Sequence, residues 1–182
     1  MIISLTGFMG VGKSTIARLL GGSLCCKVID IDRLIEKEQG KSVAEIFQNF
    51  GENYFRKLEE ETLNRIIGDN NEKLLIISLG GGTLISQNNQ KIVKENTYCI
   101  YLRASVNLLT ERLAAHRGKR PALDSIDDNS LEQEVSDLLQ KRLNGYENTA
   151  KLIIDVDEKS VRSILNEIIS GLDSFNEAFS EV

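Results

Sequence analysis

The sequence predicts a single α/β domain in which a five-stranded parallel sheet is flanked by helices. Five short apolar runs alternate with segments of helical periodicity, which is the pattern of a doubly wound sheet. The run Lys73–Leu79 is almost continuously apolar, as expected for a parallel strand covered on both faces. The length of 182 residues suits one such domain, and an apolar fraction of 41% is enough to form a core.

Strands are predicted where apolar and β-branched residues cluster. In chain order they are Ile2–Thr6, Cys25–Ile29, Lys73–Leu79, Tyr98–Leu102 and Leu152–Val156. Helices are predicted where apolar residues recur at helical spacing or where an N-cap residue precedes them. They cover about Ile16–Leu20, Leu34–Gly40, Val43–Phe50, Glu52–Ile67, Ser86–Glu95, Val106–His116, Leu131–Tyr146 and Ser160–Ile169.

Local signals sharpen three of these boundaries. Ser42 is followed three residues later by Glu45, which is the spacing of a capping box at a helix start. The polar stretch Arg117–Asn129 has no apolar periodicity and is predicted to be a loop, and the residues from Asp173 onward are predicted to be loosely held. No internal repeat or linker divides the sequence, so residues 1–182 are predicted to form one domain.

Composition narrows the classes of partner and compartment. A formal net charge of −5 disfavours nonspecific binding to nucleic acid or to an anionic membrane. Cys25, Cys26 and Cys99 lie in apolar runs, which predicts buried thiols in a reducing compartment. Neither a signal peptide nor a membrane span is expected, so we expect a cytoplasmic protein, and we expect it to be a monomer.

The segment Gly7–Thr15 fits the P-loop pattern G-x-x-x-x-G-K-[ST] at every fixed position, between a predicted strand and a predicted helix. Backbone N–H groups of such a loop surround phosphate oxygens, and the following helix directs its positive end at the same anion. The residues expected to bind ATP here are Gly10, Val11, Gly12, Lys13, Ser14 and Thr15. The Ser14 hydroxyl is also a hard oxygen ligand for Mg²⁺.

Asp30 and Asp32 lie two residues apart at a predicted strand end. In an extended chain such residues face the same side, so both carboxylates could face the nucleotide. One could hold Mg²⁺ through water and the other could accept a proton from a substrate hydroxyl. The alternative is a polar strand end that caps the next helix.

Two other segments have both a functional and a structural interpretation. Arg56 and Glu59 can meet on one helix face, either as an exposed ion pair or as a carboxylate-binding arginine held by its partner. Gly80, Gly81 and Gly82 follow the central predicted strand, either as a flexible turn or as a place where a substrate or phosphate approaches the backbone.

Basic residues gather late in the chain. The segment Arg112–Asp124 carries four cations, Arg112, Arg117, Lys119 and Arg120. It is either a solvated basic loop or a lid that brings a cation to the transferring phosphoryl group. His116 has no orienting partner in the sequence and is predicted to be a bystander, and Arg142 taken alone is predicted to lie on a solvated helix face.

Taken together, these segments resemble the shikimate kinases along almost the whole chain. The P-loop alone is shared by many NTPases. The motifs Asp-x-Asp, Phe-Arg-x-x-Glu-Glu, Gly-Gly-Gly and Arg-Pro-x-Leu, in this order and at these intervals, define a much narrower group of proteins. The matching segments are Gly7–Thr15, Asp30–Asp32, Ile35–Glu36, Ile46–Phe47, Gly51–Glu52, Phe55–Glu60, Leu79–Gly82, Arg120–Leu123, Arg142 and Tyr146.

The resemblance implies a P-loop fold like that of the nucleoside-monophosphate kinases, with a mobile lid at about 113–126 and a substrate-binding helical region at about 32–67. It implies transfer of the γ-phosphoryl group of ATP to the 3-hydroxyl of shikimate, with Mg²⁺, on the route to chorismate and aromatic amino acids.

By position, the resemblance also implies site residues. Asp32 would bind the shikimate hydroxyls and act as the base, and Asp30 would order Mg²⁺ through water. Arg56 and Arg142 would clamp the carboxylate, which reverses the structural interpretation given for each. The remaining assignments are the backbone of Gly80–Gly82 for the substrate, Phe47 and Phe55 for its ring, Arg120 as the lid cation and Arg112 against adenine.

The sequence departs from the family pattern at Leu143–Gly145, where members often carry a proline before the tyrosine that matches Tyr146. The interval from Arg112 to Arg120 is also one residue longer than expected. Two other functions stay open: a P-loop kinase of another small hydroxy acid such as gluconate, and a nucleotide-binding module without catalysis.

Overall fold

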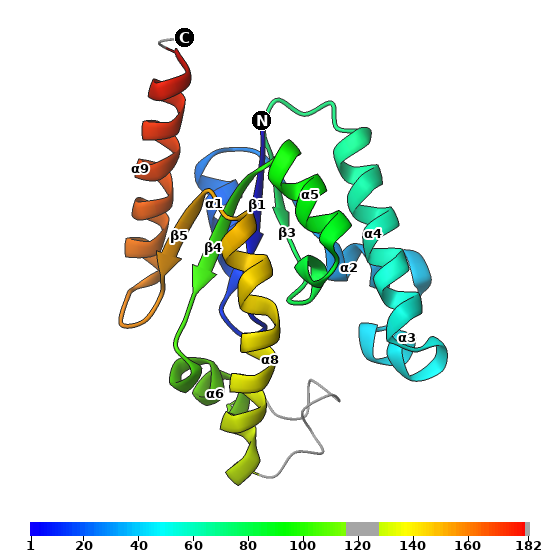
Figure 1. Ribbon diagram of the computed structural model, residues 1–182. Coiled ribbons are helices and arrows are strands. Elements are labelled where there is room, and N and C mark those ends of the chain that lie inside the picture. The colour runs from blue at the N-terminus through cyan, green and yellow to red at the C-terminus, as the bar shows by residue number, and fades with distance from the viewer. Residues whose placement is uncertain (116–127, 181–182) are drawn as a thin grey trace.

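The computed structural model describes residues 1–115 and 128–180, and the described chain forms a five-stranded parallel sheet between two layers of helices (Figure 1). The strand order is β2-β3-β1-β4-β5, with every neighbouring pair parallel. The strands are β1 (Ile2–Thr6), β2 (Lys27–Asp30), β3 (Leu75–Ser78), β4 (Tyr98–Arg103) and β5 (Leu152–Asp155). The predicted fold class is therefore confirmed.

Each connection between strands passes through at least one helix. The helices are α1 (Lys13–Ser23), α2 (Ile31–Gln39), α3 (Val43–Phe50), α4 (Glu52–Gly68), α5 (Gln87–Asn96), α6 (Val106–Ala114), α8 (Asp128–Thr149) and α9 (Val161–Ser180). A short 3₁₀-helix, η1 (Thr83–Ile85), joins β3 to α5. All five strands point the same way, so their carboxyl ends and the loops that follow them share one edge of the sheet (Figure 1).

A separate core fills each face of the sheet. On one face, Ile3 and Leu5 of β1 pack with Leu20 of α1 and Ile168 of α9. On the other, residues of β3 and β4 pack with apolar side chains of α2, α4, α5 and α8, namely Ile35, Phe55, Leu63, Val93 and Tyr146. Burial on both faces explains why the inner strands β1, β3 and β4 are continuous apolar runs rather than alternating ones.

The capping box predicted at Ser42 is present. The backbone N–H of Glu45 donates to the Ser42 hydroxyl at 3.2 Å, and the backbone N–H of Ser42 donates to Glu45 Oε2 at 2.7 Å. Several helix boundaries were predicted wrongly, among them both ends of α1, which spans Lys13–Ser23 rather than about Ile16–Leu20. Helix α2 begins at Ile31 rather than Leu34, α8 already includes Asp128 in the predicted loop, and α9 runs to Ser180 instead of ending at Ile169.

The cysteine prediction was wrong in part. Cys99 is buried, and this burial raises the pKa of its thiol to about 11. Cys25, however, is exposed, in a left-handed conformation just before β2. Across the described residues, none of the helices is both long enough and apolar enough to cross a bilayer.

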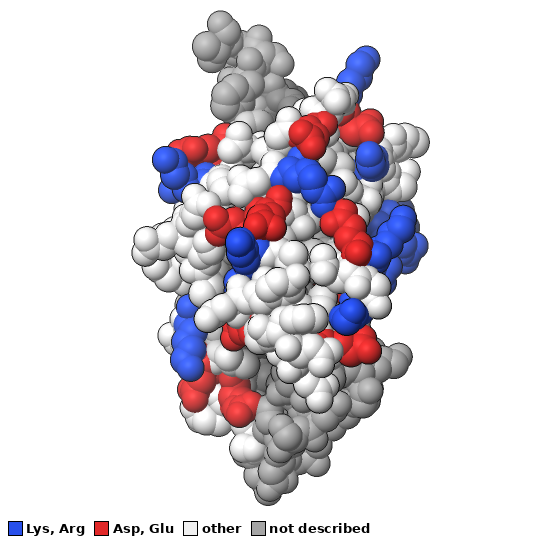
Figure 2. All heavy atoms as spheres, turned by 90° about the vertical axis from the view of Figure 1, so that its right-hand side faces the viewer, with Lys and Arg blue, Asp and Glu red and all other residues white. Residues whose placement is uncertain are grey.

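Opposite charges are mixed on the side of the molecule that carries α4 in Figure 1. Figure 2 shows positive and negative side chains interspersed over this face. Helix α4 takes part in exposed ion pairs: Arg65 pairs with Glu38 at 2.7 Å, and Lys57 pairs with Glu61 at 3.9 Å. Exposed pairs of this kind contribute little to stability.

Candidate active site

The loop between β1 and α1 forms the cup that the P-loop pattern predicts. Gly7, Gly10 and Gly12 all have positive φ angles, of 141°, 84° and 109°. A side chain is strained in that conformation, and a Cβ on Gly7 would also lie 2.5 Å from the carbonyl oxygen of Leu102. The glycines are therefore needed for the path of the backbone.

Lys13 opens α1 and folds back across this loop. Its Nζ donates to the carbonyl oxygens of Gly7 at 2.8 Å and of Phe8 at 3.0 Å, and the side chain is buried. The ammonium group is thus held over the cup that surrounds a phosphate in P-loop proteins.

Ser14 and Asp30 place two hard oxygen atoms beside the cup. The Ser14 hydroxyl donates to Asp30 Oδ2 at 2.7 Å, and Asp30 Oδ1 accepts from the backbone N–H of Arg33 at 3.3 Å. A hydroxyl and a carboxylate at the mouth of the loop are the donor types that Mg²⁺ prefers, so these residues fit that ion.

Asp32 does not sit on an extended strand as the sequence argument assumed. Asp30 ends β2 and caps α2, so Asp32 lies in the first turn of that helix. Its pKa is raised from the ordinary value of 3.8 to about 6, mainly because the carboxyl group is buried and then because Glu59 is close. Lys13 and Arg56 partly offset this rise.

The Gly80–Gly82 turn after β3 is the point where the site residues meet. A Cβ on Gly80 would lie 2.6 Å from Glu59 Oε1 and 2.7 Å from Asp32 Oδ1. A Cβ on Gly81 would lie 3.2 Å from the backbone nitrogen of Met9 in the P-loop. The turn therefore runs between the phosphate cup and the buried carboxylates, with no room for side chains at Gly80.

Arg56 reaches this turn from α4. Its Nη1 donates to Glu59 Oε2 at 2.7 Å, while Nε and Nη2 donate to Glu52 Oε1 at 3.2 and 3.0 Å. A Cβ on Gly82 would collide with its guanidinium. The structural interpretation of Arg56 as an exposed surface ion pair is wrong, because its partner Glu59 is fully buried.

Arg142 reaches the same turn from α8, 86 positions further along the chain. Its Nη1 donates to the carbonyl oxygen of Gly81 at 3.2 Å, and its guanidinium carbon lies 5.3 Å from the ring centre of Phe8. The side chain is buried, so the prediction of a solvated helix face is wrong. The Tyr146 hydroxyl donates to the same carbonyl oxygen.

Two aromatic rings border Arg56. Phe47 of α3 and Phe55 of α4 lie with their ring centres 4.9 Å apart. The Arg56 guanidinium carbon lies 5.8 and 5.4 Å from these two rings, which is within cation–π range.

Arg112 lies against the P-loop. Its Nη1 donates to the carbonyl oxygen of Val11 at 2.8 Å, which places this cation beside the nucleotide loop. Arg117, Lys119, Arg120 and His116, and with them most of the predicted lid, lie outside the described residues.

Sequence reasoning missed Thr83, whose hydroxyl donates to Glu59 Oε1. It also assigned no role to Tyr146, although this residue lies four positions after Arg142 and hence on the same helix face. Thr83 gave no local signal, since its partner lies 24 residues earlier on another helix.

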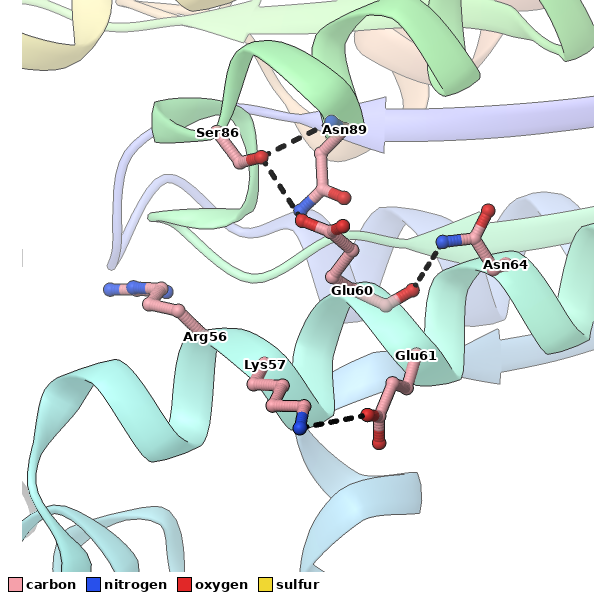
Figure 3. A pocket seen from close by; sticks show the side chains of 7 residues that line it. All are labelled: Arg56, Lys57, Glu60, Glu61, Asn64, Ser86 and Asn89. Atoms are coloured by element: carbon pink, nitrogen blue, oxygen red, sulfur yellow. Dashed lines mark hydrogen bonds and ion pairs between the residues drawn. The ribbon is translucent and has the colours of Figure 1, made fainter.

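A cavity of about 370 Å³ lies between α4 and the start of α5 (Figure 3). Figure 3 shows Arg56 extending from α4 toward the turn before Ser86, while Glu60 accepts a hydrogen bond from Ser86 at 3.2 Å. The hydrogen bond between Ser86 and Glu60 thus connects α4 to the segment that follows the glycine turn.

A phosphate cup that shares one turn with a half-buried arginine, a buried arginine and a buried carboxylate suits phosphoryl transfer from a nucleotide to a small acid. The chain is thus a kinase of the P-loop class. Comparison with known proteins narrows this class, since the family model for shikimate kinase matches residues 9–173. The chain belongs to the shikimate kinase family.

Individual shikimate kinases match this chain along nearly the full length of both proteins. The shikimate kinase of Chlorobium phaeobacteroides is 39% identical over 96% of this chain and 92% of its own. The crystal structure of shikimate kinase from Bacteroides thetaiotaomicron matches with a TM-score of 0.87 at 29% identity, over 95% of this chain and 98% of its own. The Acinetobacter baumannii shikimate kinase in complex with shikimate matches with a TM-score of 0.85 at 29% identity, over 95% and 93%.

A gluconokinase from Sinorhizobium meliloti shares the fold alone, with a TM-score of 0.56 at 15% identity over 98% of this chain and 94% of its own. The predicted family, fold class and enzyme class are confirmed by these comparisons.

Proposed function

We propose that this protein transfers the γ-phosphoryl group of ATP to the 3-hydroxyl of shikimate, and that the residues around the Gly80–Gly82 turn carry out the transfer. One observation carries this proposal: the turn lies against three parts of the site. Gly81 lies beside Met9 of the P-loop and accepts a hydrogen bond from Arg142, and Gly82 lies against the guanidinium of Arg56. The donor and acceptor halves of a kinase site would therefore share one piece of backbone.

The ATP end would be held by the backbone N–H groups of Gly10, Val11 and Gly12, with Lys13, Ser14 and Thr15 at the start of α1. On binding, the Lys13 ammonium would exchange loop carbonyls for phosphate oxygens. Ser14 directly, and Asp30 through water, would hold Mg²⁺. When bound, this ion would neutralise charge on the β- and γ-phosphates.

The acceptor end would be fixed by its carboxylate. Arg56 and Arg142 approach neighbouring glycines of one turn, so their guanidinium groups could grip one small anion from two sides. The backbone of Gly80–Gly82 and the rings of Phe47 and Phe55 would border the rest of the molecule. A site with two arginines favours a carboxylate over a neutral analogue, because the neutral group cannot form the charge-assisted hydrogen bonds that the guanidinium groups offer.

Asp32 would act as the base. Its raised pKa of about 6 makes it a better proton acceptor than an ordinary aspartate while it stays ionised at neutral pH. The 3-hydroxyl oxygen would bond to the γ-phosphorus as the bond from that phosphorus to the bridging oxygen of ADP breaks. The hydroxyl proton would pass to Asp32.

Two further cations belong to the proposal. Arg120, from the lid at about 113–126, would stabilise charge on the transferring group, and Arg112 would contact the nucleotide. Arg112 is supported by its bond to the Val11 carbonyl oxygen. We also propose that the protein works as a cytoplasmic monomer, which size-exclusion chromatography with light scattering would test.

Phosphorus NMR of ATP, Mg²⁺ and shikimate tests the function directly. A new phosphate monoester signal should grow as ADP forms. Gluconate in place of shikimate should give little product, and equal turnover of the two acids would contradict the assignment. ATP binding without any phosphorylated product would instead favour a nucleotide-binding module.

A further inference from the structure

Glu59 is a carboxylate with no access to water, at 0% exposure. A buried charge is costly unless each of its oxygens is hydrogen-bonded. Oε2 accepts from Arg56 Nη1, and Oε1 accepts from the Thr83 hydroxyl. Within residues 1–115 and 128–180, no other donor reaches Oε1.

Thr83 is itself held rigidly. Its backbone N–H donates to the Gly80 carbonyl oxygen at 3.2 Å, and its own carbonyl oxygen accepts from Asn89 Nδ2 at 3.0 Å. The side chain is fully buried. Because both backbone groups are engaged and the side chain is enclosed, Thr83 can anchor Glu59 through its hydroxyl.

The two carboxylates that bind Arg56 are unequal. The Glu52 side chain is 57% exposed, so water competes with its bonds to the guanidinium. Glu59 is enclosed, so its bond holds the guanidinium beside the glycine turn without competition from water. The orientation of Arg56 therefore depends on whichever group fixes Glu59.

We propose that Thr83 is a positioning residue for the acceptor acid: through Glu59 it holds Arg56 in the orientation that binds the carboxylate. This inference rests on the proposed function in naming shikimate as the acid. Without the hydroxyl, Glu59 Oε1 loses its donor, and because a buried carboxylate oxygen without a hydrogen bond is costly, the side chain turns away from this position. Arg56 then loses its enclosed partner.

Two substitutions separate the hydroxyl from the shape of the side chain. Thr83→Val keeps the volume and removes the donor, and it should raise the shikimate KM about tenfold while the ATP KM changes less than twofold. Thr83→Ser keeps the donor and should restore the KM to within about twofold of wild type. A Val variant with an unchanged shikimate KM, or a Ser variant as impaired as Val, would overturn the proposal.

Thr149→Val is a matched control. Thr149 is also buried, but its hydroxyl has no hydrogen-bond partner among the residues that the structure describes. Removal of this hydroxyl should leave both KM values unchanged, and a rise equal to that of Thr83→Val would assign the effect to general loss of packing.

A double-mutant cycle tests whether Thr83 acts through Arg56. In an Arg56→Ala background, Thr83→Val should have almost no further effect on the shikimate KM. A full additional tenfold rise would show that Thr83 acts by another route and would contradict the inference.

A measurement without substrate distinguishes failure of this inference from failure of the proposed function. In ¹⁵N-arginine spectra, the Arg56 Nε–H signal, assigned by its loss in Arg56→Lys, should shift and broaden in Thr83→Val but not in Thr83→Ser. If wild-type protein fails to phosphorylate shikimate while this signal still responds, the function is wrong and the positioning role stands. If the signal is unchanged, the positioning role is wrong whatever the substrate.

Discussion

Replacement of Asp32 with asparagine should stabilise the protein and inactivate it. The raised pKa of Asp32 means that the folded protein holds a proton which the unfolded chain releases near the ordinary value of 3.8. As pH rises from 3.8 to about 6, the free energy of unfolding therefore falls, and above about pH 6 the full cost of the buried charge is present.

The size of this cost follows from the displacement of the pKa. A rise from 3.8 to about 6 corresponds to about 3 kcal/mol, of which Asp32→Asn should recover most at pH 7.5 and almost none at pH 3.5. For a chain of this length, that is roughly 6–12 °C in Tm. Turnover should fall by about 10²- to 10⁴-fold, because the proton acceptor is lost.

Urea unfolding followed by circular dichroism, without nucleotide or metal, measures the stability term at both pH values. Asp173→Asn, at an exposed position of α9, is the control and should change little at either pH. In wild-type protein, kcat/KM for shikimate should decline as pH falls through about 6, since Asp32 must be ionised to act as a base. An asparagine variant that is equally or less stable at pH 7.5 would refute the reasoning.

Three further substitutions probe separate contacts. Gly80→Ala should abolish shikimate turnover because its Cβ would lie 2.6 Å from a Glu59 oxygen, and a fully active Gly80→Ala would refute the close approach. Gly22→Ala is the control and should be active, since a Cβ there meets no described atom within 4 Å. Tyr146→Phe should raise the shikimate KM several-fold with little change for ATP, since the Gly81 carbonyl oxygen keeps only its Arg142 donor; equal effects on both substrates would point to general loosening. Ser42→Ala should lower the free energy of unfolding by about 1 kcal/mol in urea titration, and no change would mean that the capping box adds nothing.

The parts of the fold and site that depend on local patterns could be predicted from sequence. The P-loop is a contiguous segment whose glycines are needed for its own backbone path. Its role can therefore be predicted from these nine residues alone. The inner strands β1, β3 and β4 are continuous apolar runs because both faces are covered. The Ser42 cap depends only on a residue three positions away.

Other features depend on contacts between distant segments. Helix α9 continues beyond its predicted end at Ile169, partly because Phe175 packs on Tyr98 with ring centres 4.5 Å apart. The local argument for Asp32 assumed extended chain, but Asp30 uses its carboxylate to cap α2 and starts the helix early.

The arginine pair shows the same limit more sharply. Arg56 and Arg142 each read as ordinary surface cations in their own helices, and only the resemblance to a family linked them. Their proximity comes from the glycine turn, which α4 and α8 approach from different parts of the chain. The hydrophobic periodicity of either helix does not predict that these two arginines approach the same turn.

The claim that two arginines on one turn recognise the carboxylate of the acceptor is tested most directly by comparing kcat/KM for shikimate with that for its methyl ester. The ester, which lacks the negative charge, should be used at least about a hundredfold less efficiently. Equal efficiency for the acid and the ester would contradict it.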